Sequence, residues 1–206
     1  VEIDDKISFV IKKTEEIMED SEYHDVRLSL DAYLDKTRIP LKIDISTGDV
    51  ITPCEISFSY QLMFENRTIP LLAYPPVTVL AEKLETILSR GEANTRLRDF
   101  YDVYILQRED FVVTPDALCH ALLATCRKRG HEDLLHTYAS ILDRVRQSDT
   151  MRTQWMKYQS DFDYAAGITW DTVLDTVETL CMKTLDDHAF GDELPQEESQ
   201  FEMHLL

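Results

Sequence analysis

The residue pattern of this chain changes period once, near residue 75, and that change restricts the folds open to it. Before this point apolar and polar residues alternate, which is the pattern of a strand with one apolar face. The clearest example is RIPLKIDISTGDV, residues 38–50, where every second position from 41 to 45 is apolar. After this point apolar residues recur every three or four positions, as in helices. Strands followed by helices predict an α+β chain.

Residues 1–75 are predicted to be the β-rich part. Alternation over 7–11 indicates a short strand, and the polar segment 11–24 reads as a turn of helix or a loop. Alternation resumes over 25–34, and DKTR is typical of a hairpin turn into the next strand, near 38–46. A second hairpin is expected where ISFSYQLMF and TIPLLAY flank ENR.

Residues 76–190 are predicted to form a helical bundle. Pro76 and Thr78 are typical of a helix start, and Gly91 suits the C-cap of that helix. A second helix is expected to start near Thr95. Three more are expected from Thr114, over 132–145 and over 170–185. The remaining residues, 191–206, read as an acidic, solvated tail.

The composition narrows the classes of partner and compartment. A net charge of −18 argues against broad, nonspecific binding to nucleic acid, although it leaves room for a local basic cleft. Cys119 and Cys126 share one face of an expected helix, which favours their packing in the core. The four cysteines include no CxxC pair, and this pattern favours a cytoplasmic location with reduced thiols. No apolar run approaches the ~18–20 residues that a membrane helix needs.

Two pairs of charged residues stand out against these apolar elements. Lys42 and Asp44 lie in the middle of a strand, on the face opposite its apolar residues. A solvated strand face is the simpler interpretation of this pair. Lys83 and Arg90 are seven residues apart and share one helix face, where both side chains could extend to solvent from the edge of a buried surface.

A third cluster lies further along the chain, in RLRDFYDVY. Its charged residues step by three along one side of a helix, so a structural ion-pair network is the simpler interpretation. Arg98 and Asp102 also have the i,i+4 spacing of an ion pair. The members of this cluster are Arg96, Asp99 and Asp102.

In this order, the three clusters resemble the motifs of the AbiEii/AbiGii toxin family of nucleotidyltransferases. The first is K-I-D-I-x-x-G at 42–48, the second K-L-x-x-I-x-x-R at 83–90, and the third R-x-x-D-x-Y-D at 96–102. The resemblance implies a minimal nucleotidyltransferase of the DNA-polymerase-β-like superfamily, with part of its mixed β-sheet followed by a C-terminal helical bundle. It also implies the toxin half of a bacterial toxin–antitoxin or abortive-infection system.

The resemblance assigns roles to individual residues. It implies transfer of a nucleoside monophosphate from a nucleoside triphosphate to an acceptor such as RNA, with Mg²⁺ as cofactor. Asp44 would bind the metal and act in catalysis together with Lys83 and Asp99. The residues implied in nucleotide binding are Lys42, Lys83, Arg90, Arg96 and Asp102. The implied partner is a cognate antitoxin encoded nearby. A second copy of the chain is also expected as a partner, because a sheet that lacks a strand exposes an edge that tends to pair with another chain.

One expected motif does not occur before Lys42. The family pattern places a glycine turn, a helix and a strand with D-x-D upstream of Asp44. The adjacent Asp4 and Asp5 would face opposite sides of a strand and could not chelate together. The one D-x-D of this chain, 161–163, lies far downstream among expected helices and reads as a surface feature.

We therefore expect that the D-x-D motif lies upstream of Val1, that this chain alone is inactive, and that its incomplete sheet exposes an edge or an apolar patch. Two alternatives remain open. The chain could be a noncatalytic module that binds a nucleotide or a protein, or a kinase-like phosphotransferase on the same scaffold.

Overall fold

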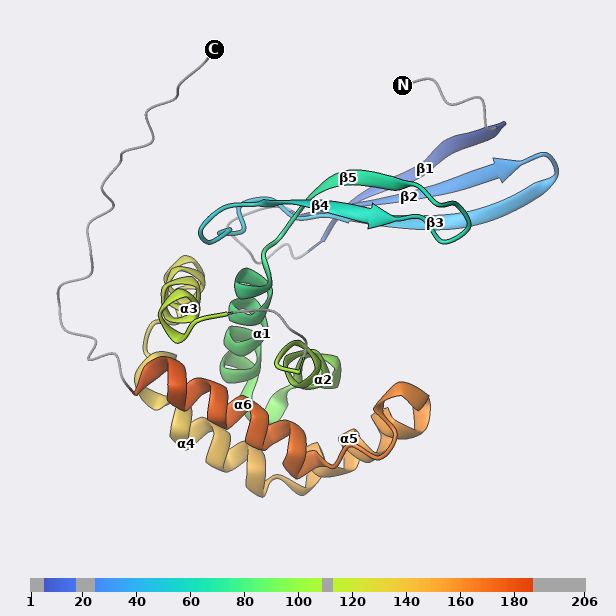
Figure 1. Ribbon diagram of the computed structural model, residues 1–206. Coiled ribbons are helices and arrows are strands. Elements are labelled where there is room, and N and C mark those ends of the chain that lie inside the picture. Colours follow the sequence, from blue (N-terminus) through green and yellow to red (C-terminus); the bar gives the residue numbers. More distant parts are fainter. Residues whose placement is uncertain (1–5, 18–24, 109–112, 187–206) are drawn as a thin grey trace, which may run out of the picture. The chain divides into compact units, whose positions relative to one another are not determined.

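The computed structural model describes residues 6–17, 25–108 and 113–186, and these divide into two compact units (Figure 1). The first unit ends at Asp49 and the second begins at Val50. Strands precede helices along the chain, so the α+β class is confirmed. The acidic tail predicted over 191–206 lies outside the described residues.

The first unit is an antiparallel sheet in the order β1-β2-β3, with β1 at Ile7–Ile17, β2 at Asp25–Leu34 and β3 at Thr37–Ile45. The turn expected at DKTR is present, since Leu34 pairs with Thr37. Asp35 has a φ of 52°, a left-handed conformation that aspartate tolerates better than most residues.

One prediction for this unit is wrong. The polar segment from residue 11 was expected to be a helical turn or a loop, but β1 continues through it to Ile17, which pairs with Asp25. Its main-chain groups are bonded to β2, and most of its side chains are exposed. Polar residues are compatible with this part of β1, because β1 is an outer strand and its side chains can remain exposed on both faces.

The apolar face of this sheet is only partly buried. Leu30 and Ala32 of the central strand are buried, at 7% and 8% exposure. The apolar side chains of the outer strands remain exposed, including Phe9 at 62% and Ile43 at 47%. The alternation around residues 41–45 therefore predicted the strand correctly, but it does not report burial.

The second unit opens with the expected hairpin, β4 at Ile56–Gln61 and β5 at Thr68–Ala73. Among the described residues, six α-helices follow: α1 Pro76–Arg90, α2 Leu97–Leu106, α3 Pro115–Arg129, α4 Leu134–Gln147, α5 Asp149–Asp161 and α6 Trp170–Leu185. All five predicted helices are present. The sixth, α5, was not predicted, although Met151, Trp155 and Tyr158 have helical spacing and are buried.

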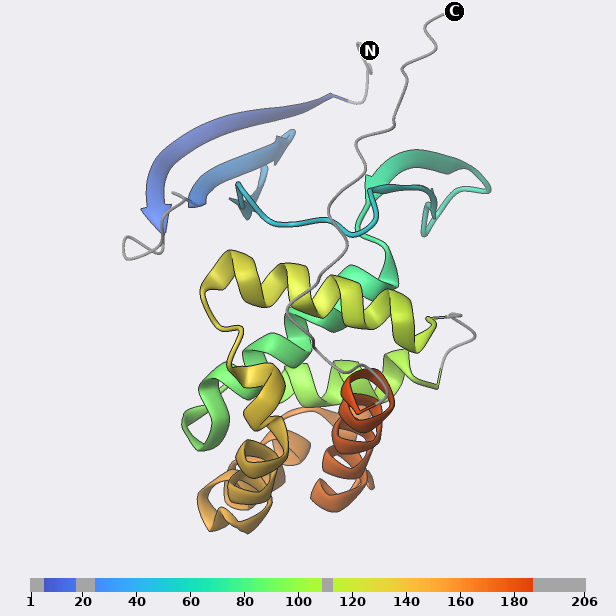
Figure 2. The ribbon, with the colours of Figure 1, turned by 90° about the vertical axis from the view of Figure 1, so that its left-hand side faces the viewer.

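Helix α1 is the central element of the second unit. Both views show it beside α2 and α3, while α4 packs on α6 (Figures 1 and 2). Leu80, Leu84 and Ile87 of α1 are completely buried. At its start, the hydroxyl of Thr78 accepts from the main-chain nitrogen of Thr52 and donates to its oxygen, each at 2.9 Å. These contacts fix the position of α1 relative to the preceding chain.

The cysteines behave as core residues. All four are free thiols; Cys54 is exposed and the other three are buried. Core packing of Cys119 and Cys126 is therefore confirmed. Burial raises the pKa of both Cys126 and Cys181 to about 12, so these thiols stay protonated and unreactive at neutral pH. Within the described residues, no helix is both long and apolar enough to cross a membrane.

We predict that the α1 core dominates the stability of the second unit. Leu84→Ala should lower the free energy of unfolding by about 2–5 kcal/mol, because it leaves a cavity at a fully buried position. Leu72→Ala, at a position 75% exposed, is the matched control and should cost less than about 0.5 kcal/mol. Urea unfolding followed by the helical circular-dichroism signal measures both. Equal losses would contradict this assignment of the core.

Candidate functional site

The second and third motifs meet in one charged cluster between α1 and α2. The ammonium nitrogen of Lys83 lies 3.1 Å from Oδ1 of Asp99 and 2.6 Å from Oδ2 of Asp102. All three side chains are less than one third exposed, at 19%, 14% and 28%. The structure thus brings together three site residues that are up to 19 positions apart in the chain.

Packing of the two helices explains this meeting. On α1, Lys83 is flanked by Leu80, Leu84 and Ile87, so its stem lies at the edge of the buried surface. On α2, Asp99 and Asp102 are one turn apart, while Phe100 and Val103 are completely buried. Burying the apolar residues of both helices therefore turns the two carboxylates toward Lys83.

The charge state of Lys83 is set by opposing effects. Burial lowers its pKa, but the hydrogen bond and the negative charge of Asp102, together with those of Asp99, outweigh burial and raise the pKa above its ordinary value. Lys83 is therefore cationic at neutral pH. An ammonium group has three N–H donors, and the two carboxylates account for two of them. One donor remains for a further acceptor such as a phosphate oxygen.

The i,i+4 pair expected between Arg98 and Asp102 is not the arrangement in the structure. Asp102 bonds to Lys83, whereas Arg98 hydrogen-bonds to Tyr158. This bond, together with the nearby Tyr164, raises the pKa of the Arg98 guanidinium. The reason is tertiary: α1 presents a cation to Asp102, and the α5 region presents tyrosine hydroxyls to Arg98.

Two motif arginines lie at neighbouring helix ends. Arg90 is the last residue of α1, and Arg96 is the N-cap of α2. The short connection between them is fixed by Asn94, whose side-chain oxygen accepts from the main-chain nitrogen of Arg96 at 2.7 Å. Both arginine side chains are exposed, and neither forms an ion pair within the part of the chain that the structure describes. They are the candidate cations for an external anion.

The first motif belongs to the other unit. Both oxygens of Asp44 accept from Arg27 across the β2–β3 pair, at 2.6 and 2.7 Å. The hydrogen bond from Arg27 lowers the pKa of Asp44, and the charge of Lys42 acts in the same direction. Asp44 is therefore ionised at neutral pH. Lys42 is exposed on the same strand.

These residues do not by themselves form a magnesium site. Mg²⁺ requires several oxygen ligands in near-octahedral geometry. Residues 6–17, 25–108 and 113–186 contain no group of three or more His, Cys, Asp or Glu side chains placed to hold a metal ion. In addition, both oxygens of Asp44 are bonded to Arg27.

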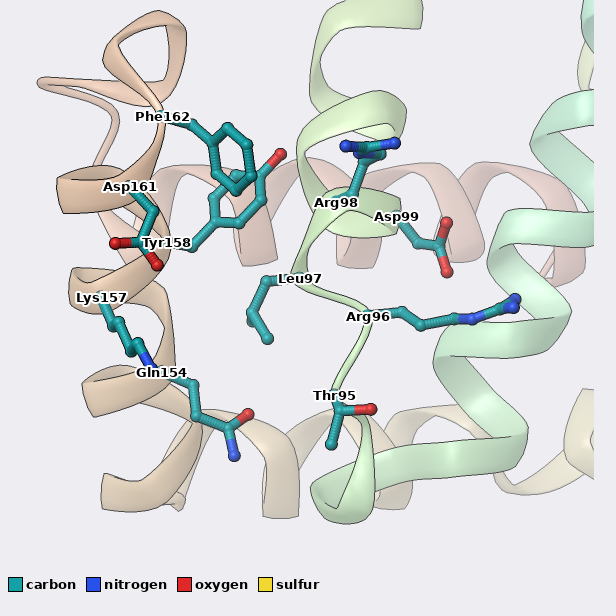
Figure 3. Close-up of a pocket in the computed structure, with 10 residues that line it drawn as sticks. All are labelled: Thr95, Arg96, Leu97, Arg98, Asp99, Gln154, Lys157, Tyr158, Asp161 and Phe162. Carbon is teal, nitrogen blue, oxygen red and sulfur yellow. The ribbon is translucent and has the colours of Figure 1, made fainter. Parts of the chain in front are cut away.

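Sequence reasoning missed several residues at these sites. Arg27 could have been found, because the two-residue turn after Leu34 fixes the register that places it opposite Asp44. Gln154 and Lys157 could not have been found from the sequence. They belong to the unpredicted α5 and line a cavity together with Arg96 and Asp99 of the third motif (Figure 3).

A family model described as "Nucleotidyl transferase AbiEii toxin, Type IV TA system" matches residues 1–176. The chain belongs to this family. The resemblance carried by the three motifs is thus confirmed, and the match covers both units and reaches into α6. At the family level the protein is a nucleotidyltransferase-like toxin of a type IV toxin–antitoxin system. No curated protein and no solved structure matches the chain.

We predict that the Lys83 cluster makes stability sensitive to alkaline pH. Because the pKa of Lys83 is raised in the folded protein, its contribution is fully present below its ordinary value of 10.5 and is lost as pH rises above it. Lys83→Met should therefore show a shallower loss of the free energy of unfolding above about pH 10.5 than the parent. Chemical unfolding at a series of pH values measures this difference.

The matched control is Lys183→Met, which removes an exposed lysine in the last turn of α6. This variant should keep the alkaline slope of the parent. Identical slopes for the parent and Lys83→Met would show that the ammonium contributes nothing through its two carboxylates.

Proposed function

We propose that this protein transfers a nucleoside monophosphate from a nucleoside triphosphate to a hydroxyl group of an acceptor, with RNA as the acceptor. In this reaction the acceptor oxygen forms a bond to the α-phosphorus, the bond from that phosphorus to the bridging β-oxygen breaks, and pyrophosphate leaves. The hydroxyl proton passes to a base. The observation that carries the proposal is the cluster of Lys83, Asp99 and Asp102 in a chain of this family.

The cations would hold the triphosphate. Arg90 and Arg96 are exposed, and a guanidinium can bind two phosphate oxygens at once. Lys83 adds its third N–H, and Asp99 and Asp102 fix the direction in which the ammonium group points. Asp99 and Asp102 thus act as positioning residues. Lys42 is the proposed cation from the first motif.

Asp44 is the proposed catalytic carboxylate. A pKa lowered by Arg27 makes it a weaker base than a free aspartate, but it keeps the carboxylate charged, as a ligand of a hard cation must be. Mg²⁺ remains the proposed cofactor on the strength of this one carboxylate and the phosphates of the substrate. Arg27 would have to release at least one oxygen of Asp44 for the metal to bind there.

The partners of the protein and its location in the cell are also proposals. A type IV toxin–antitoxin family implies a cognate antitoxin, and we propose that it is encoded nearby. We propose a cytoplasmic protein, because its thiols are free and its substrates are nucleotides. The exposed apolar side chains of β1 and β3 are the proposed contact of a homo-oligomer.

The transfer reaction can be tested with labelled nucleoside triphosphates and RNA, using the protein encoded by the complete gene. We predict that Asp44→Ala abolishes transfer but weakens nucleotide binding only slightly. Lys83→Ala should weaken nucleotide binding about tenfold, because it removes a charge-assisted contact. Asp99→Ala should lower activity. Transfer by Asp44→Ala at the level of the parent would rule out the role proposed for this residue.

The control for the carboxylates is Asp143→Ala, an exposed aspartate on α4, which should leave transfer unchanged. Thermal melting of every variant separates loss of chemistry from loss of folding. Asp102→Ala is expected to lower the melting temperature at least as much as it lowers activity, since Asp102 makes the shorter bond to Lys83.

The pairing of Asp44 with Arg27 favours one alternative, a noncatalytic module that binds a nucleotide or a protein. In that case the pair is only structural, so Asp44→Ala and Arg27→Ala should lower the melting temperature of the first unit alike, and the parent should bind nucleotide without transferring it. If the catalytic proposal is correct, Arg27→Ala should keep measurable transfer while Asp44→Ala does not.

A further inference from the structure

A cavity of about 640 Å³ lies between the start of α2 and the length of α5, within the second unit (Figure 3). This volume is within the range of pockets that bind small molecules, about 300–1,000 Å³. It borders the third motif through Arg96 and Asp99, but most of its wall lies outside all three motifs. The lining residues that matter below are Arg98, Gln154, Lys157, Tyr158 and Phe162.

The cavity is locally basic in a strongly acidic protein. It is lined by three cations, Arg96, Arg98 and Lys157, and by two carboxylates, Asp99 and Asp161. Asp99 is already bonded to Lys83, so its charge is largely compensated. Because the whole chain has a net charge of −18, a site with excess positive charge here is selective for an anion.

One wall of the cavity is apolar and firmly packed. Tyr158 stacks on Trp155 with ring centroids 5.3 Å apart and contacts Phe162 at 4.8 Å. Leu97 of α2 lies in the gap between the two elements, opposite these rings (Figure 3). A planar aromatic group of a ligand can pack against such a wall without rearranging it.

The amide of Gln154 provides the most specific feature. Its Oε1 atom is buried and has no hydrogen-bond partner among the described residues. A buried acceptor without a partner is costly, about 1–3 kcal/mol, and is therefore uncommon. Figure 3 shows this side chain extending from α5 toward the start of α2, with Lys157 beside it. A ligand with an N–H group at this position would satisfy the acceptor.

We propose that this cavity binds one nucleotide unit. The base packs against Leu97 and Phe162 and donates an N–H to Oε1 of Gln154, and its phosphate is held by Lys157 and the arginines at the start of α2. The proposal rests on the proposed function and adds to it a subsite that extends from the third motif to α5. The same chemistry is offered by a free nucleoside triphosphate, the donor, and by the terminal nucleotide of an RNA acceptor.

Binding measurements test the proposal and distinguish the two sources. The protein encoded by the complete gene is titrated with each nucleoside triphosphate by calorimetry and with a fluorescent short oligoribonucleotide by anisotropy. Gln154→Leu and Lys157→Ala should each weaken at least one probe by about fivefold or more, the range expected for loss of one polar or charge-assisted contact. A loss confined to triphosphate identifies a donor site, and a loss confined to the oligoribonucleotide identifies an acceptor site.

The matched controls are Gln147→Leu and Lys183→Ala, two exposed positions on α4 and α6 that do not line the cavity. Both should bind each probe as the parent does. Thermal melting identifies any variant that has lost its fold. In that case Gln154→Glu serves as a second variant, because it keeps the shape of the side chain but places a negative charge that repels the phosphate. The proposal is overturned if cavity variants and parent bind both probes equally, or if the parent binds neither.

Transfer assays on the same variants separate this proposal from the proposed function. If the parent transfers nucleotide and the cavity variants bind and react like the parent, the cavity proposal fails and the proposed function stands. If the cavity variants lose binding while the parent shows no transfer, the proposed function fails and the nucleotide site stands.

Discussion

The contact on which the arrangement of the candidate site depends is the bond of one ammonium group to two carboxylates. Lys83 joins α1 to α2 through Asp99 and Asp102 at the edge of the buried core. Removing water from these groups is costly, so each of them needs the others to remain charged. The bond joins α1 to α2 near the helix ends that carry Arg90 and Arg96. The three side chains that join the two helices are therefore also those to which we assign the positioning of the proposed anion site.

Charge in this protein is compensated locally. The chain is strongly acidic, yet its motif carboxylates are each bonded to a cation: Asp44 to Arg27 in the first unit, and Asp99 and Asp102 to Lys83 in the second. Among the exposed cations, Arg90 ends α1, Arg96 begins α2, and Lys157 lines the cavity beside α5. A polyanionic ligand would otherwise be repelled by the net charge, so such cations decide where it can bind.

The strand region shows how far residue patterns can be read. Alternation and the DKTR turn predict β2, β3 and their register, because side chains alternate between the faces of any strand. The polar end of β1 was misread, since main-chain pairing with β2 holds it in the sheet without help from apolar side chains. The same alternation did not reveal that Phe9 and Ile43 are exposed, because burial depends on what packs against the face and not on the strand itself.

The sequence by itself determined the α+β class, the three motifs that resemble the family's, and every helix of the described residues except α5. Periodicity, capping residues and motif spacing are local properties, so they can be read from the sequence. Only the tertiary structure decided which charges are partners. Asp102 had a local candidate in Arg98, one turn away, but bonds to Lys83 from another helix, and Arg98 bonds to Tyr158. The cavity beside α5 is likewise formed by segments more than fifty residues apart. Such pairings follow from how buried faces pack against one another, which no local pattern records.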